Sequence, residues 1–182
     1  MLTTMSEIDF KQARFNMVEQ QIRTWEVLDY RVLDVMMEVP RDEFVPEKHR
    51  RLAYSDLPIP LPHGQAMMHP KIEARMVQAL DVHPGDKVLE VGTGTGYVTA
   101  LLARLGGEVY SVELHRDLMQ GAAEKLKAHG IDNVTLEEGD AADGWETHAP
   151  YDAIAITGSM AGVPEAYKHN LKIGGRLFVV VG

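Results

Sequence analysis

The stretch Lys87-Val88-Leu89-Glu90-Val91-Gly92-Thr93-Gly94-Thr95-Gly96-Tyr97 decides the fold. It begins as an apolar run with β-branched residues, typical of a strand buried on both faces, and then has a glycine at every second position. Apolar residues return at helical spacing from Val98 to Ala103, so the stretch predicts a strand, a tight turn and a helix. Glycines allow positive φ and close approach of a ligand, and a helix start offers unpaired N–H groups. A nucleotide-like ligand is expected at this turn.

The spacing of glycines and acids narrows the choice of ligand. A dinucleotide fingerprint reads G-x-G-x-x-G and binds a pyrophosphate, which does not need an acid such as Glu90 before the first glycine. Glu113 ends the next apolar run, roughly 20 residues on, where a strand-end carboxylate can accept hydrogen bonds from ribose hydroxyls. The pattern favours S-adenosylmethionine over NAD, so an NAD-dependent oxidoreductase is the weaker alternative. The glycines alone are also compatible with a turn that merely packs closely.

Downstream of the turn, strand-like and helical segments alternate. The expected strands are residues 87–91, 108–113, 134–138, 151–157 and 176–181, and a helix over residues 116–128 ends before Gly130. Repeated strand, crossover and strand predict an α/β fold: a Rossmann-like, mostly parallel sheet with helices on both faces and a ligand crevice at the carboxyl ends of its strands. The last run is a buried-strand composition at the end of the chain, so we expect either a sheet cut after its fifth strand or a partner chain over that edge.

Upstream of the turn, the sequence predicts a helical extension. An amphipathic helix is expected from about Ile8 to Thr24, and a second begins after the N-cap Asp29 and ends at Pro40. Prolines between residues 40 and 62 predict extended chain without regular ladders, and Pro70 starts another helix. We therefore expect residues 1–80 to form a helical cap with a substrate-side loop, and residues 81–182 to form the cofactor-binding core of the same compact unit.

Composition excludes several classes of function. The chain has 182 residues, a formal net charge of -9 and scattered Lys and Arg, so no nucleic-acid partner is expected. It has no cysteine, no apolar run long enough to cross a bilayer and no histidine spacing such as H-E-x-x-H, so neither a membrane nor a metal site is expected. A cytoplasmic location fits these features.

Several motifs outside the glycine turn resemble one family, the protein-L-isoaspartate O-methyltransferases. The resemblance rests on Val39-Pro40-Arg41-Asp42-Glu43-Phe44-Val45-Pro46, Ala53-Tyr54, Leu61-Pro62-His63-Gly64-Gln65, the glycine turn with Tyr97, Gly139-Asp140, Gly144, Pro150-Tyr151-Asp152 and Leu171-Lys172-Ile173-Gly174-Gly175-Arg176-Leu177. It implies a class I methyltransferase that uses S-adenosylmethionine to methylate the carboxylate of isoaspartyl residues in damaged proteins or peptides.

The resemblance also implies which residues bind the cofactor. S-adenosylmethionine would lie over the glycine turn, with Glu90, Gly92, Thr93, Gly94 and Gly96 among its binding residues. Glu113 would take the ribose hydroxyls, Leu114 would flank the adenine, and Asp140 with Ala141 would meet the adenine edge. From the residues alone, an acid that stabilises a turn is the favoured interpretation of Asp140, and Glu113 is equally a solvated strand-end charge.

One departure from the family motif concerns the acceptor. After the Gly-Gln pair the family has Thr-Ile-Ser, a small or polar residue and Pro, whereas this chain reads Ala66-Met67-Met68-His69-Pro70. Met68 stands where the family has the serine that hydrogen-bonds the substrate carboxylate, and a thioether has no donor. His69 is a candidate replacement donor, or else an exposed helix cap. The departure leaves two further hypotheses open: a divergent methyltransferase with another acceptor, and a non-catalytic binding module.

Overall fold

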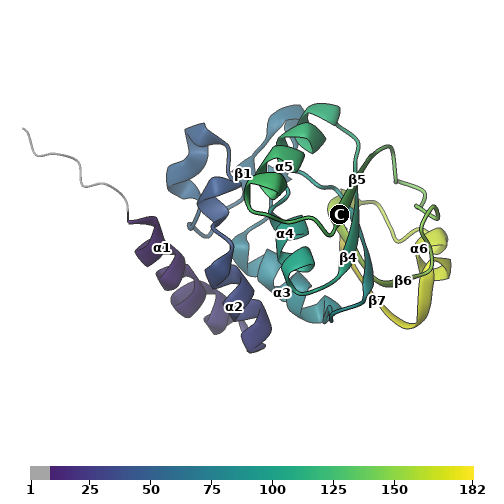
Figure 1. Cartoon of the computed structure of the whole chain (residues 1–182), viewed down its shortest axis with the longest axis horizontal. Helices are drawn as coiled ribbons and strands as arrows, with labels where there is room; N and C mark the ends of the chain where they lie inside the picture. Colours follow the sequence, from purple (N-terminus) through teal and green to yellow (C-terminus); the bar gives the residue numbers. More distant parts are fainter. Residues whose placement is uncertain (1–8) are drawn as a thin grey trace, which may run out of the picture.

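The computed structural model describes residues 9–182, so Ile8, where the first helix is expected to begin, lies outside the described residues. The first eight residues of the expected helical cap lie outside them as well. In Figure 1 the helices of the N-terminal part gather at one end of the molecule, and the main sheet stands beside them. The helices over residues 70–80 and 97–104 lie between the two parts and contact both the N-terminal helices and the main sheet.

The main sheet has five strands in the order β5-β4-β3-β6-β7, and each neighbouring pair is parallel. The strands are β3 (Lys87–Val91), β4 (Glu108–Glu113), β5 (Val134–Glu138), β6 (Tyr151–Met160) and β7 (Leu171–Val181). The predicted Rossmann-like α/β fold is confirmed. β3 is the central strand: the chain adds β4 and β5 on one side of it and then returns to add β6 and β7 on the other. The strand order therefore reverses between β3 and β6, and the carboxyl ends of these two strands flank the point where ligands bind in such sheets.

Helices cover both faces of this sheet. They are α3 (Pro70–Leu80), α4 (Tyr97–Arg104), α5 (Arg116–Ala128) and α6 (Glu165–His169). Side chains alternate along each strand, so Val88 and Ala153 join the cluster that contains α3 and α4, whereas Leu89 and Ile154 join a second cluster with Tyr167 of α6. In Figure 1, α6 lies across the sheet from α3 and α4. The two clusters hold the strand ends in place from both sides.

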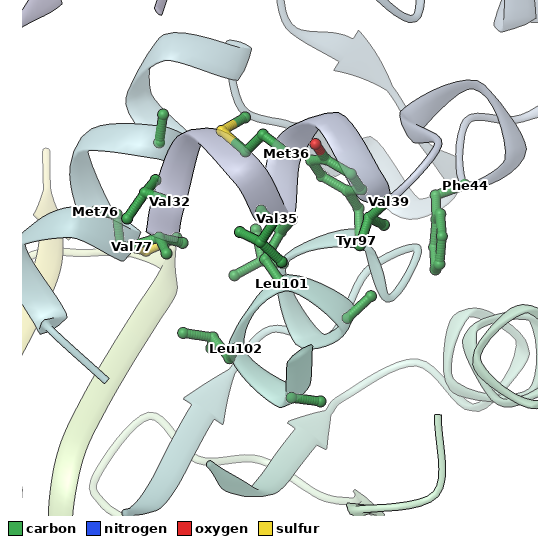
Figure 2. Packing of buried hydrophobic residues seen from close by; sticks show 14 of the residues in the cluster. Val32, Val35, Met36, Val39, Phe44, Met76, Val77, Tyr97, Leu101 and Leu102 are labelled. Carbon is green, nitrogen blue, oxygen red and sulfur yellow. The ribbon is translucent and has the colours of Figure 1, made fainter. Parts of the chain in front are cut away.

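The N-terminal extension is one helical run followed by a second helix. The run comprises α1 (Phe10–Asn16), a π-helical turn η1 (Met17–Ile22) and a 3-10 turn η2 (Arg23–Trp25), and α2 follows over Tyr30–Glu38. Asp29 caps α2 as predicted, because its carboxylate accepts from the Arg31 N–H. Figure 2 shows apolar residues of α2 packed against α3 and α4. The extension and the sheet thus share one hydrophobic core.

The proline-rich segment is more ordered than the sequence predicts. It contains 3-10 turns η3 (Arg41–Glu43), η4 (Glu47–Leu52) and η5 (Pro62–Gly64), and β1 (Ile59–Pro60) pairs with β2 (Ala66–Met67) in a short antiparallel ladder. The expectation of chain without ladders is wrong here. Pro40 and Pro46 stand at N-cap positions of the 3-10 turns, where no backbone N–H is required. The resulting β1–β2 hairpin leads directly into α3.

Candidate functional site

The three glycines of the turn after β3 have different surroundings. All have positive φ, which is +98° at Gly92, +55° at Gly94 and +86° at Gly96. A Cβ on Gly92 would lie 2.6 Å from the Thr157 hydroxyl, and one on Gly96 would lie 3.1 Å from Ala122 of α5. A Cβ on Gly94 would meet a single leucine methyl at 3.6 Å. Gly92 and Gly96 therefore allow close packing of protein against protein, whereas Gly94 leaves its main chain open to a cleft.

Glu90 lies beneath the turn and is completely buried. Its Oε2 accepts hydrogen bonds from the hydroxyls of Thr99 at 2.5 Å and Ser111 at 2.6 Å, and the Thr93 hydroxyl is 2.6 Å from that of Ser111. Burial raises the pKa of Glu90 to about 7, and the two hydroxyl donors oppose this shift. Its Oε1 is buried without a partner among the described residues, so a polar ligand group or a water can pair with it.

Glu113 stands at the end of β4 next to the turn, and only 5% of it is exposed. Its Oε2 accepts from the Gly94 N–H at 2.8 Å, and its Oε1 accepts from the His115 N–H at 3.0 Å. Each carboxylate oxygen keeps a further acceptor site. The buried, oriented carboxylate differs from the solvated strand-end charge that was the alternative interpretation of the sequence.

A cleft runs along the carboxyl ends of β3, β4, β5 and β6. It is lined by Gly94, Glu113, Leu114, Asp140 and Ala141, among others. The Asp140 carboxylate accepts from the Ala142 N–H at 2.9 Å, so it stabilises a turn and lines the cleft at once. Ala141 is buried, and Leu114 is exposed.

These residues fit an adenosine moiety. Ribose hydroxyls need acceptors, which Glu113 supplies, and a flat base needs apolar surfaces with a polar group at its edge, which Leu114, Ala141 and Asp140 supply. The open main chain at Gly94 leaves room that a side chain would fill. Of the predicted cofactor residues, Gly96 faces α5 and the Thr93 hydroxyl faces Ser111, so both support the turn from behind.

Met68 and His69 point to different places. Met68 lines a smaller cavity beside the cleft, together with Glu90, Gly94 and Tyr97. His69 is the N-cap residue of α3 without a side-chain capping bond, and its Nδ1 lies 3.2 Å from a carboxylate oxygen of Asp56. The His69 ring is therefore paired with the Asp56 carboxylate at the surface.

Two groups of lining residues were missing from the sequence-based site. The β1–β2 hairpin contributes Leu61, Gln65 and Ala66, and the end of β6 contributes Thr157 and the residues after it. Thr157 was accessible to prediction, because it ends an expected strand and such ends share one edge of a parallel sheet. The hairpin had no such signal. Among residues 9–182, no group of three or more His, Cys, Asp or Glu side chains could hold a metal ion.

The parallel sheet, the glycine turn after β3, the carboxylate ending β4 and the aspartate after β5 define a class I S-adenosylmethionine-dependent methyltransferase. The model of the protein-L-isoaspartate(D-aspartate) O-methyltransferase family matches residues 12–182. The chain belongs to this family, and it is an S-adenosylmethionine-dependent O-methyltransferase. The non-catalytic binding module is not supported.

Individual relatives agree with this assignment. Protein-L-isoaspartate O-methyltransferase 1 of Rhodopseudomonas palustris is 45% identical over 173 residues, which are 95% of this chain and 71% of that protein. A solved protein-L-isoaspartate O-methyltransferase is 29% identical with a TM-score of 0.76, covering 94% of this chain and 55% of the other. A Plasmodium falciparum structure described as a complex of such an enzyme with S-adenosyl-L-homocysteine has a TM-score of 0.78 at 23% identity, covering 97% and 85%, and shows the shared fold.

Proposed function

We propose that the chain binds S-adenosylmethionine in the cleft at the carboxyl ends of β3, β4 and β5 and methylates the carboxylate of isoaspartyl residues in proteins or peptides. The observation that carries the proposal is the buried Glu113 carboxylate beside the open main chain of Gly94. Glu113 takes the ribose hydroxyls, Leu114 and Ala141 flank the adenine, and Asp140 accepts from its edge. Membership of the family supports isoaspartate as the acceptor.

The main task of the protein in this reaction is to position the acceptor carboxylate against the methyl group of the cofactor. In an isoaspartyl residue the peptide bond runs through the β-carboxyl, so the acceptor is the free α-carboxyl, whose ordinary pKa is about 3.3–3.7. It is therefore already a nucleophile at neutral pH, and no general base is needed. The cofactor supplies an electrophilic methyl group on a sulfonium. Holding the acceptor oxygen in line with it can supply roughly 7 to 11 kcal/mol of the barrier. Met68 and Tyr97 line the small cavity beside the cleft, where the acceptor would meet the methyl group.

A direct assay tests this function. The protein is incubated with methyl-labelled S-adenosylmethionine and a peptide that contains one isoaspartyl residue, with the matched aspartyl peptide as control. We expect base-labile label on the isoaspartyl peptide alone. Binding of S-adenosylhomocysteine without any labelled ester would refute isoaspartate as the acceptor, while the proposed cofactor site would still be supported.

A second candidate is methylation of a different acceptor. It is motivated by Ala66 and Met68, which carry no hydroxyl where the family has threonine and serine, and both line the small cavity. Restoring the hydroxyl separates the candidates. A hydrogen bond to a charged group contributes about 1.5 to 3 kcal/mol, so Met68→Ser should raise kcat/KM for the isoaspartyl peptide by roughly 10- to 150-fold. Absence of any gain, in a protein whose native form is inactive, would favour a different acceptor.

Several expectations from the sequence stay predictions. They are a division near residue 80, the absence of nucleic-acid and membrane partners, a cytoplasmic location and a partner chain over the last strand. Across the described residues 9–182, no helix is both long and apolar enough to span a bilayer. β7 lies at an edge of the main sheet and exposes Ile173 and Val181, which is the surface that such a partner would cover.

A further inference from the structure

Arg41 is a completely buried cation whose hydrogen bonds converge on three segments of the chain. Its Nε donates to Oε2 of Glu73 at 3.1 Å, its Nη1 to the carbonyl of Ala53 at 2.6 Å, and its Nη2 to the carbonyl of Met68 at 2.9 Å. Burial raises the pKa of Glu73, and the guanidinium opposes that shift by stabilising the carboxylate. A planar guanidinium holds several acceptors in one fixed geometry, which a lysine ammonium cannot do.

The Met68 carbonyl needs such an anchor because its segment has little regular structure. The β1–β2 ladder consists of two residue pairs, Ile59 with Met67 and Pro60 with Ala66, and a proline has no N–H to donate. After Met67 the chain belongs to no strand until α3 begins at Pro70. The hydrogen bond from Arg41 therefore acts at the point where the ladder has ended and the helix has not begun.

This position matters because Met68 lines the cavity beside the cofactor cleft. It lines the small cavity with Gly92, Gly94 and Tyr97, while its own carbonyl is turned to Arg41. The Arg41 guanidinium also lies over the Tyr97 ring, 5.5 Å from its centroid, and Tyr97 is the first residue of α4 after the glycine turn. One side chain thus contacts both walls of the cavity, at residue 68 and at the start of α4.

We propose that Arg41 is a positioning residue for the acceptor side of the active site. Together with Glu73 it holds the backbone at Met68 at a set distance from the glycine turn, so that the acceptor carboxylate meets the methyl group in line. This inference rests on the proposed methyltransferase function. It assigns to the arginine of the Val39-Pro40-Arg41 motif a role in acceptor placement and none in cofactor binding.

The test compares Arg41→Lys with the matched control Arg14→Lys. Arg14 also donates to a backbone carbonyl of the N-terminal half, that of Met37 at 2.8 Å, but Met37 lines neither the cofactor cleft nor the small cavity, whereas Met68, which accepts from Arg41, lines the small cavity. Misplacement of reacting groups by about 1 Å can cost on the order of a hundredfold in rate. We expect Arg41→Lys to lower kcat for the isoaspartyl peptide roughly ten- to a hundredfold. The Kd for S-adenosylhomocysteine should stay within about twofold of the native value, because the hydrogen bonds of Arg41 involve none of the residues proposed to bind the cofactor.

Hydrogen exchange supplies a readout that does not require activity. In Arg41→Lys the amides of residues 65–69 should exchange faster, while those of residues 87–96 keep their native protection. In Arg14→Lys both segments should behave as in the native protein. Glu73→Gln, which keeps the shape of the Arg41 partner, should show a smaller change of the same kind.

The outcomes separate this inference from the proposed function. An inactive native protein would refute isoaspartyl methylation, and the exchange of residues 65–69 would still decide whether Arg41 holds them. Native kcat and native exchange in Arg41→Lys would overturn the positioning role. Equal loss of cofactor affinity and acceptor turnover would also overturn it, as would unfolding of both Arg41→Lys and Glu73→Gln, because Arg41 would then support the fold as a whole.

Discussion

The cofactor side and the acceptor side of this molecule are built in different ways. The cofactor side uses the ends of parallel strands, where Gly94 and Glu113 are joined by a hydrogen bond across neighbouring strands. The acceptor side uses a two-pair ladder, short 3-10 turns and the buried pair of Arg41 and Glu73. Strand ends are placed by the sheet itself, whereas the segment at Met68 is placed by side chains. We therefore expect substitutions on the two sides to separate cofactor affinity from acceptor turnover.

The largest effect on stability is expected on the acceptor side. Glu73→Leu leaves the Arg41 guanidinium buried without its anionic partner, and such changes cost about 3–5 kcal/mol. Urea unfolding measures the loss. The double variant Arg41→Met with Glu73→Leu should lose less than the single one, because no buried charge remains. A single variant as stable as the native protein would mean that the pair does not hold this side together.

A pH dependence is expected from the cofactor side. An acid whose pKa is higher in the folded than in the unfolded state binds more protons when folded, so stability falls as pH rises. For Glu90 the window runs from its ordinary value of 4.5 to about 7. Across this window the free energy of unfolding should fall by on the order of 3 kcal/mol. Unfolding free energies measured between pH 5 and 7.5 should lose this slope in Glu90→Gln, and an unchanged slope would assign the titration to another group.

Cofactor affinity should depend on Glu113 and be insensitive to a neighbouring strand-end acid. A hydrogen bond to a charged group contributes about 1.5 to 3 kcal/mol, so Glu113→Gln should weaken S-adenosylhomocysteine binding by roughly 10- to 150-fold in calorimetry. Glu138→Gln is the matched control, because Glu138 ends β5 and its side chain is about half exposed. Equal affinities for the two variants would remove Glu113 from the ribose site.

The smallest effects on stability are expected from two glycine substitutions, one in the turn after β3 and one in α5. Gly92→Ala places a Cβ 2.6 Å from the Thr157 hydroxyl at φ +98°, which should cost about 1–3 kcal/mol of stability. Gly121→Ala in α5 meets nothing within 4 Å at an ordinary helical position and should gain roughly 0.5–1 kcal/mol. Thermal unfolding of the two variants should therefore shift in opposite directions. A shift in the same direction would contradict the close approach of the turn to β6.

Much of the cofactor side was predictable from the sequence because its signals are local. The apolar run before Gly92 predicts the central strand, and Glu113 follows from the end of the next strand. The separate surroundings of the glycines were not predictable, because they depend on Thr157 and Ala122, which come from other elements. The proline-rich segment was misjudged, since 3-10 turns need few hydrogen bonds and leave little periodic signal.

By itself, the sequence determined the class of fold and the kind of ligand, because the strand, turn and helix signals lie within a few residues of one another. Each signal reflects a local need of the backbone, such as apolar periodicity in a strand or helix and glycine at a positive φ in a turn. The tertiary structure alone decided where Met68 and His69 face and what Arg41 binds. Arg41 and Glu73 are 32 residues apart, and their pairing depends on how α3 packs beside η3. Contacts between distant segments follow from the packing of the whole core, which no local pattern of residues encodes.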